Sequence, residues 1–249
     1  IDIGGGTYNS LQIVNGNPAI SYSTGYPGSL KYVRATNASG TAWGTPVIIA
    51  AVTSEAHTSL EIVNGLPAIT YFGPAGLQYV RATDASGSAW AIPVTIDAGR
   101  GRYTSLQIVN GNPAVTYFNS SGNLKYVRAN DASGTDWGNP DTLYEGSGEY
   151  CSMINTSNGA AIAYYNSSDA LPYFISGGLL CQVGYWVGNF SSSWENPANW
   201  SCGILPDINT NVIINTSAAC LLSSSVSVKS VTVNQGSSFS NNGHLNIGP

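Results

Sequence analysis

One six-residue stretch returns along the chain at a fixed interval and constrains the fold more than any other feature. It reads Leu30-Lys-Tyr-Val-Arg-Ala35, Leu77-Gln-Tyr-Val-Arg-Ala82, Leu124-Lys-Tyr-Val-Arg-Ala129 and, in degenerate form, Leu171-Pro-Tyr-Phe-Ile-Ser176. The tyrosines stand at 32, 79, 126 and 173, a constant step of 47. A period of this length without helical patterning indicates a β unit that buries its apolar faces against copies of itself.

Each period holds four short β-type runs, which we name strands a to d. In the second period they are Leu60–Val63, Ala68–Tyr71, Leu77–Thr83 and Trp90–Ile96. Between strands a and b, an Asn-Gly pair predicts a type I′ turn, in which both central residues need positive φ. Tandem four-stranded antiparallel units of this length predict the blades of a β-propeller. The fold class is therefore all-β, beginning with a small propeller of four repeats.

The turn between strands c and d is repeated as well. Its copies are Asn37-Ala-Ser-Gly-Thr-Ala-Trp43, Asp84-Ala-Ser-Gly-Ser-Ala-Trp90 and Asp131-Ala-Ser-Gly-Thr-Asp-Trp137. We predict that Asp84 and Asp131 accept hydrogen bonds from the N–H groups of their own turns. Trp43, Trp90 and Trp137 should anchor the hairpins as buried side chains. The pattern resembles the Asp-box of sialidases and related propellers, with one extra residue between Asp and Gly, and this resemblance implies a structural element.

A repeated arginine ends strand c, at Arg34, Arg81 and Arg128. Each stands three positions before the first residue of the c–d turn. We predict that the guanidinium pairs with that turn residue and lies along the turn's Trp as a cation–π contact. The predicted role of the three arginines is therefore structural.

The first and fourth repeats leave ring closure open. The fourth repeat has Ser176-Gly-Gly178 in place of the c–d turn, and its candidate strand d is Leu179–Val183. At the other end, Ile1-Asp2 match Ile96-Asp97, the end of a strand d. The propeller, assigned to residues 1–183, is either a complete four-bladed ring, which we favour, or part of a larger ring.

Residues 184–249 do not follow the 47-residue repeat and contain other motifs. They contain Trp186-Val-Gly188, Trp194-Glu-Asn-Pro-Ala-Asn-Trp200, Gly203-Ile-Leu-Pro206 and Val212-Ile-Ile214. This spacing resembles a segment of large secreted and surface proteins of Bacteroidota that are exported by the type nine system, and it implies location rather than chemistry. Short alternating strands with Asn and Gly corners predict a β-solenoid or β-sandwich-like segment, in which Trp194 and Trp200 pack in the core or cap.

Composition narrows the classes of partner and compartment. Charged residues make up 8% of the chain and the net charge is −5, which argues against nucleic acid and anionic membranes as partners. No apolar run reaches the ~18 residues that a membrane span needs. Four cysteines without CxxC spacing favour disulfides over a metal site and indicate an extracellular or cell-surface protein. We predict the bridges Cys202–Cys220 and Cys151–Cys181, with no metal and no cofactor.

The loops at the two ends of the blades differ in character. The a–b and c–d turns repeat almost verbatim, whereas the b–c and d–a loops vary between copies, and function in repeat folds concentrates on variable loops. Four residues at the start of strand a are predicted to ring the mouth of the central channel on that variable face: Tyr8, His57, Tyr103 and Tyr150. Plugging the channel is their alternative role. The neighbours predicted to flank them are Tyr26, Arg100, Arg102, Glu145 and Glu149.

These observations favour a non-enzymatic binding or adhesion module. With only two histidines, His57 and His244, in different units, a Ser-His-Asp triad or a catalytic zinc is poorly supported. Glycan is the expected ligand, since aromatic rings stack on apolar sugar faces while polar neighbours fix orientation; a cell-surface protein is a further expected partner. Two rivals remain. One is a structural unit of a surface layer, filament or stalk that associates with copies of itself, and the other is a glycoside hydrolase fragment using two carboxylates.

Overall fold

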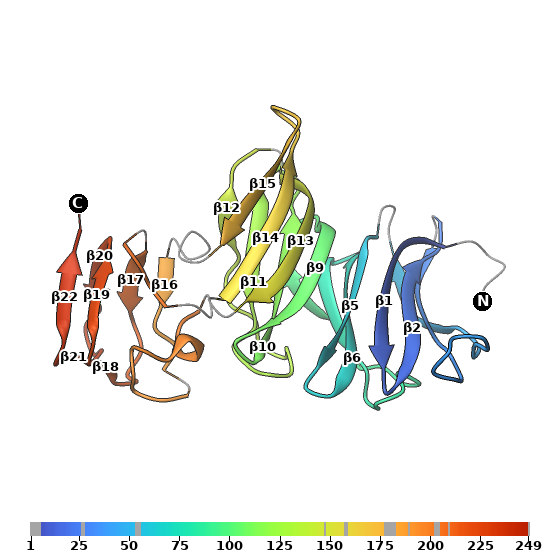
Figure 1. Cartoon of the computed structure of the whole chain (residues 1–249), viewed down its shortest axis with the longest axis horizontal. Helices are drawn as coiled ribbons and strands as arrows, with labels where there is room; N and C mark the ends of the chain where they lie inside the picture. The colour runs from blue at the N-terminus through green and yellow to red at the C-terminus, as the bar shows by residue number, and fades with distance from the viewer. Residues whose placement is uncertain are drawn as a thin grey trace.

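The computed structural model is built from β-strands arranged along one long axis (Figure 1). It describes residues 6–25, 28–52, 56–146, 148–156, 159–176, 183–188, 190–201, 205–208 and 210–248. Within these ranges, no helix has the length and hydrophobicity required to cross a membrane.

The first three repeats each form a four-stranded antiparallel sheet, in which strands a to d are neighbours in chain order. The first blade is β1 (Thr7–Val14), β2 (Asn17–Ser23), β3 (Gly28–Arg34) and β4 (Val47–Val52). The second is β5 (Thr58–Val63), β6 (Leu66–Gly73), β7 (Gly76–Arg81) and β8 (Val94–Asp97). The third is β9 (Arg102–Val109), β10 (Asn112–Phe118), β11 (Leu124–Arg128) and β12 (Asp141–Tyr144). The blades are those predicted, although in the second blade strand c ends at Arg81 rather than Thr83, and strand d begins at Val94 rather than Trp90. Both shifts arise because Ala82 and Trp90 make only an isolated bridge.

The fourth blade has three described strands, β13 (Gly148–Thr156), β14 (Gly159–Asn166) and β15 (Leu171–Ser176). The sequence alignment placed Tyr173 with Tyr32, but the strand register does not. Tyr32 pairs with Ser21 on the central strand, and the equivalent partner in β14, Ala163, faces Phe174. Strand c of the fourth blade is thus shifted by one residue, which reverses the face on which each side chain lies.

The blades pack face to face through three apolar cores. One core joins Val14, Leu30 and Tyr32 of the first blade to Leu60 and Ile69 of the second, and equivalent cores follow at the next two junctions. Strand β1 packs on β5, β5 on β9 and β9 on β13, but among the described strands no comparable contact joins β13 to β1. The favoured four-bladed ring is therefore wrong: the blades form an open arc that leaves Leu11 and Ile154 exposed at its two ends.

The repeated turns have the predicted backbone chemistry. Both residues of each Asn-Gly turn have positive φ, for example 45° at Asn15 and 78° at Gly16. In the c–d turn, the Asp84 carboxylate accepts hydrogen bonds from the N–H groups of Ser86 and Ala89, both at 2.8 Å. Asp131 accepts equivalent bonds in the third blade. Hydrogen bonds led by that from Ser86 hold the pKa of Asp84 well below its usual range.

Two predicted details of the scaffold need correction. Trp43, Trp90 and Trp137 are half-buried rather than fully buried, and each indole N–H donates to the glycine carbonyl of its own turn at 2.8 to 2.9 Å. The arginines do not pair with the turn carboxylates. Arg34 donates to the carbonyl oxygens of Val14 and Asn15, both at 2.7 Å, because strand b brings the a–b turn beside the end of strand c.

Arg81 and Arg128 make the same pair of hydrogen bonds in the next two blades, to Val63 and Asn64 and to Val109 and Asn110. The planar guanidinium fork suits two successive carbonyl groups. Arg128 alone is buried, and it also reaches the carbonyl oxygen of Trp200 at 3.4 Å, which ties the third blade to the C-terminal segment. The arginines therefore brace the a–b turns.

The C-terminal segment is a β-solenoid. Its elements are β16 (Val183–Tyr185), the 3₁₀ turn η2 (Pro197–Asn199), β17 (Asn211–Ile214), β18 (Cys220–Leu222), β19 (Ser225–Val228), β20 (Ser230–Val233), β21 (Phe239–Asn241) and β22 (His244–Ile247). The pairs β17–β20, β18–β21 and β19–β22 are parallel and keep one constant step in the sequence. Residues 179–182 of the candidate strand d of the fourth blade lie outside the described residues, and its last residue, Val183, pairs with Asn211 of β17. The domain boundary after residue 183 stays a prediction.

The Trp-rich motif caps the first coil of the solenoid, as predicted. Trp194 and Trp200 are completely buried. The buried Asn199 side chain accepts hydrogen bonds from the N–H groups of Phe190 and Ser191 and donates to the Ser193 carbonyl, so it fixes the loop that covers β18.

The two predicted disulfides are not formed in the structure. Cys151 and Cys220 are free, buried thiols. Their expected partners, Cys181 and Cys202, lie outside the described residues. Cys151 instead directs its thiol at the backbone of the third blade, where it donates to the carbonyl oxygen of Tyr103.

Candidate functional site

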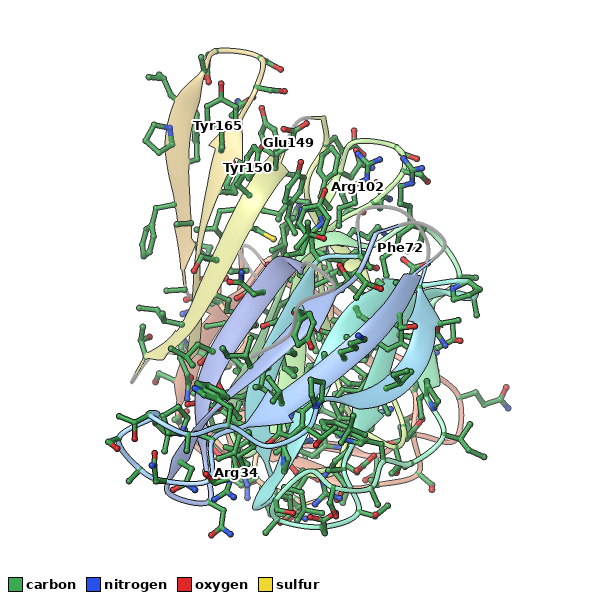
Figure 2. All side chains as sticks on the ribbon, turned by 90° about the vertical axis from the view of Figure 1, so that its right-hand side faces the viewer. Arg34, Phe72, Arg102, Glu149, Tyr150 and Tyr165 are labelled. Carbon is green, nitrogen blue, oxygen red and sulfur yellow. The ribbon has the colours of Figure 1, made fainter. Side chains whose placement is uncertain are left out.

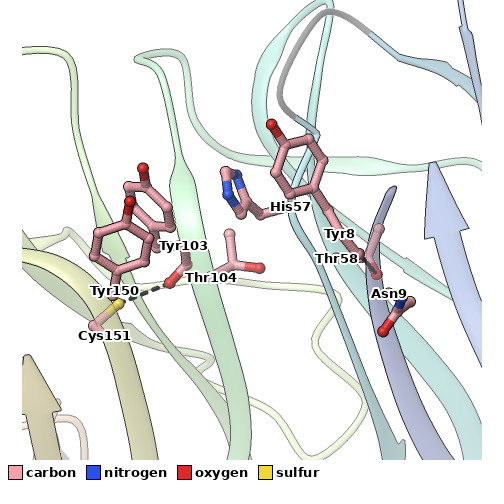
Figure 3. A pocket seen from close by; sticks show the side chains of 8 residues that line it. All are labelled: Tyr8, Asn9, His57, Thr58, Tyr103, Thr104, Tyr150 and Cys151. Carbon is pink, nitrogen blue, oxygen red and sulfur yellow. Dashed lines mark hydrogen bonds between the residues drawn. The ribbon is translucent and has the colours of Figure 1, made fainter. Parts of the chain in front are cut away.

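Four aromatic side chains, one from each blade, lie side by side at the same end of the blades (Figure 3). The ring centroids are 3.9 Å apart for Tyr8 and His57, 4.3 Å for His57 and Tyr103, and 4.3 Å for Tyr103 and Tyr150. We call these four residues the aromatic row. The sequence predicted that they share one end of the blades, and the structure joins them in a continuous tilted stack along an open arc.

Local backbone irregularity sets the direction of three of these rings. Tyr8, Tyr103 and Tyr150 have φ values of 53°, 51° and 51°, in the left-handed region that bulky residues rarely occupy. Each lies in a break of register between the first two strands of its blade. A β-bulge of this kind re-aims a side chain. In the second blade, His57 stands just before β5, whose pairing is regular from its first residue.

Neighbouring blades hold the bulges in place. The Thr58 hydroxyl donates to the carbonyl oxygen of Tyr8 at 2.8 Å, and the Cys151 thiol donates to that of Tyr103 at 2.8 Å. The row and the residue after each member line a shallow hollow of about 270 Å³. The second layer of that hollow is Asn9, Thr58, Thr104 and Cys151.

The two middle members of the aromatic row, His57 and Tyr103, are uncharged at neutral pH. Desolvation by burial lowers the pKa of His57 to about 4, so its imidazole is neutral well below pH 7. Burial, together with a hydrogen bond involving Tyr150, raises the pKa of Tyr103 to about 12. The middle of the hollow is therefore lined by two neutral rings, which can stack and exchange hydrogen bonds but cannot form ion pairs.

The predicted flanking residues differ in where they lie. Arg102 and Glu149 lie at the same end as Tyr150, and Arg34 lies at the opposite end (Figure 2). Arg100 sits over the ring of Phe72, 5.9 Å from its centroid, and Phe72 lies at the same end as Tyr150 (Figure 2). Glu145 is exposed in the loop between the third and fourth blades. Tyr26 lies outside the described residues.

One carboxyl group beyond the row escaped the sequence prediction. Glu61, on β5, accepts hydrogen bonds from the side-chain amides of Gln12 at 2.9 Å and Gln107 at 3.2 Å, which come from the adjacent blades. Burial raises its pKa above the ordinary value, although these hydrogen bonds oppose the shift. The signal was present, because Leu-Glu-Ile in the second repeat replaces Leu-Gln-Ile in the first and third.

Comparison with known proteins gives likenesses of arrangement only. No protein-family model and no curated protein matches the chain. Among solved structures, the catalytic domain of a Coprinopsis cinerea GH62 α-L-arabinofuranosidase is 15% identical over 69% of this chain and 63% of that one, with a TM-score of 0.47. Bacillus subtilis arabinanase Arb43A is 16% identical over 67% and 70%, with a TM-score of 0.46. The Aleuria aurantia lectin bound to Fucα1-6GlcNAc is 11% identical over 68% and 58%, with a TM-score of 0.47.

The chain thus spans less than two thirds of the length of the fungal arabinofuranosidase. Most of these similar structures are of glycoside hydrolases, which contradicts the prediction that the chain is not an enzyme. They do not bear on the Asp-box-like turn or on the resemblance of the tail to type nine secretion cargo.

Proposed function

We propose that the aromatic row recognises carbohydrate. The observation that carries this proposal is the placement of three tyrosines at positive φ in equivalent positions of three blades. A bulky residue in that region costs of the order of 1 kcal/mol or more, and such strain is concentrated at functional sites. A role in filling space alone would be served by residues without that strain.

The chemistry of the row suits a neutral sugar. Tyr150 at one end of the row is 63% exposed and Tyr8 at the other is 39% exposed, so aromatic surface and hydroxyl groups reach solvent together. Sugars present apolar C–H faces and hydroxyl groups, which match rings and phenols. A hollow of about 270 Å³ lies just below the range of drug-sized pockets, so it suits a ligand as small as a sugar.

A glycan array followed by calorimetric titration tests this proposal. The informative variant is Tyr103→Asn, because asparagine tolerates positive φ while the ring is lost. Asn110→Gly is the matched control, since Asn110 also has positive φ but lies in an a–b turn at the opposite end. We expect Tyr103→Asn to lose about tenfold or more in affinity, the scale of one aromatic contact. Equal affinity in Tyr103→Asn and the parent would overturn the proposal.

Glycosidic bond hydrolysis is a second candidate, favoured by Glu61. General acid catalysis of that reaction uses a carboxyl group whose surroundings raise its pKa, and burial raises the pKa of Glu61. Release of nitrophenol from a panel of aryl glycosides is the measurement. Loss of turnover in Glu61→Gln, but not in Glu145→Gln, would support this function. Turnover unchanged in Glu61→Gln would exclude Glu61 as the acid.

An extracellular or cell-surface location belongs to the same proposal. It is supported by the low content of charged residues, 8%, and by the motifs of the C-terminal segment. The motifs also imply export by the type nine system. Fractionation of cells that express the natural protein tests the location, and disruption of the type nine system tests this export route. Recovery of the protein in the cytoplasm of unperturbed cells would contradict both.

A further inference from the structure

Adjacent blades are joined by a repeated hydrogen bond between their innermost strands. Ser10 on β1 accepts from the backbone N–H of Leu60 at 3.0 Å, and Ser59 on β5 accepts from that of Leu106 at 2.9 Å. Ser105 on β9 accepts from the N–H of Met153 at 2.9 Å. In each case the serine belongs to the earlier blade and the amide to the later one.

The second connection is a tyrosine of one blade that binds the c–d turn of the next blade, which we call the tyrosine clasp. The Tyr32 hydroxyl donates to the carbonyl oxygen of Ser86 at 3.0 Å, and its ring meets Trp90 edge to face at 5.2 Å. Gly87, at φ 75°, leaves room for this ring, since a Cβ there would lie 2.6 Å from the Tyr32 ring. Tyr79 repeats the arrangement on the c–d turn of the third blade, at Ser133, Gly134 and Trp137.

In both connections the later blade contributes a backbone amide or a c–d turn, and the first blade has both of these groups. Among the described residues, neither group has a partner in another blade. We call Leu11, Ile13, Gly40 and Trp43 the receiving face. Leu11 is 68% exposed, whereas its counterparts Leu60 and Leu106 are 4% and 1% exposed. A Cβ on Gly40 would meet only Pro18 and Trp43 among its nearest neighbours, so the space that a tyrosine fills at Gly87 is open.

We propose that the receiving face docks a further propeller blade of the same repeat type. That blade supplies a serine for the Leu11 amide, a tyrosine ring for Gly40 and Trp43, and apolar side chains for Leu11 and Ile13. The surface continues an interface that the chain builds twice in full. A second copy of this chain fits less well, because its own free blade presents Phe174 where the clasp needs a phenol.

Fusion of a blade tests the proposal. A duplicate of residues 56–95 joined ahead of residue 1 keeps the native spacing to Tyr8, because Ile1-Asp2 take the place of Ile96-Asp97. Hydrogen exchange of the β1 amides in the parent and the fusion is the measurement. We expect docking to slow exchange in β1 about tenfold or more, since burial and a new acceptor protect the Leu11 amide.

Two controls give the result its meaning. In the first, the added copy carries Ser59→Ala and Tyr79→Phe, and most of the protection should disappear. In the second, residues 102–142 of the third blade replace the added segment, which guards against a duplicate that fails to fold. Unchanged β1 exchange in both fusions would overturn the proposal. Concentration-dependent protection of β1 in the unfused parent, with dimers in sedimentation, would replace the proposed blade with a second copy.

Discussion

The thiol of Cys151 donates a hydrogen bond to the carbonyl oxygen of Tyr103 at 2.8 Å, across the junction between the third and fourth blades. The Thr58 hydroxyl makes the same bond to Tyr8 at the first junction. A cysteine expected to form a disulfide is therefore a structural donor, which supports a strained tyrosine of the aromatic row from the neighbouring blade.

This relationship predicts how substitutions at Cys151 behave. Cys151→Ala leaves the partly buried Tyr103 carbonyl without this donor and should lower the free energy of unfolding by about 1–2 kcal/mol. Cys151→Thr restores the donor found in the second blade and should stay within about 0.5 kcal/mol of the parent. Urea unfolding is the measurement. Equal stability in the alanine variant and the parent would show that the thiol contributes nothing.

His57 should make stability depend on pH. Its folded pKa of about 4 lies below the unfolded value of 6.5, so the unfolded chain binds more protons between these values and stability falls as pH drops through that window. After a discount for its partial exposure, the loss is on the order of 1–2 kcal/mol.

His57→Phe keeps an aromatic ring in the row and should flatten the pH dependence between pH 6.5 and 4. Thermal unfolding of both proteins across that range checks the expectation. A slope that persists unchanged in the variant would assign the dependence to carboxyl groups instead.

The tryptophans of the c–d turns should differ in their contribution to stability. Trp90 has Tyr32 of the preceding blade against its ring, whereas Trp43 has no such tyrosine among the described residues. Trp90→Ala should cost about 2–4 kcal/mol, below the value for a fully buried ring, and Trp43→Ala about 1 kcal/mol less. Denaturant titration distinguishes the two variants, and equal losses would mean that the inter-blade ring contact adds nothing.

Asn199 should hold the solenoid cap. Its amide group makes several hydrogen bonds to the loop at 190–193 while fully buried, so Asn199→Ala should destabilise the C-terminal segment by about 2–3 kcal/mol. Asn215→Ala, at an exposed position, is the control. Limited proteolysis should cleave the Asn199 variant faster within residues 184–249. Identical cleavage of both variants would count against a capping role.

The sequence was sufficient where a pattern repeated with strict alternation. The four-stranded order of the first three blades, the hairpin turns and the shared end of Tyr8, His57, Tyr103 and Tyr150 all followed from the period. It was insufficient in β15, because Leu171-Pro-Tyr-Phe-Ile175 has bulky residues on both faces and alternation cannot set the register.

Two features of the candidate site depend on geometry that local sequence does not encode. The φ of Tyr103 arises from a bulge against β10, and tyrosine itself gives no sign of it. The sequence predicted that the Arg34 guanidinium pairs with Asn37, the nearby polar residue that begins the c–d turn. Antiparallel order instead places the a–b turn beside it, where two carbonyl groups satisfy its guanidinium.

The serine hydrogen bonds between the innermost strands favour folding of the blades in order, from the N-terminal blade onward. Each acceptor lies in the earlier blade and each amide in the later one. During synthesis, when the N-terminal part of a chain folds first, every emerging blade therefore meets a neighbour whose acceptor is already in place. Folding can thus proceed vectorially, one blade at a time, with the first blade as template for the second and the second for the third.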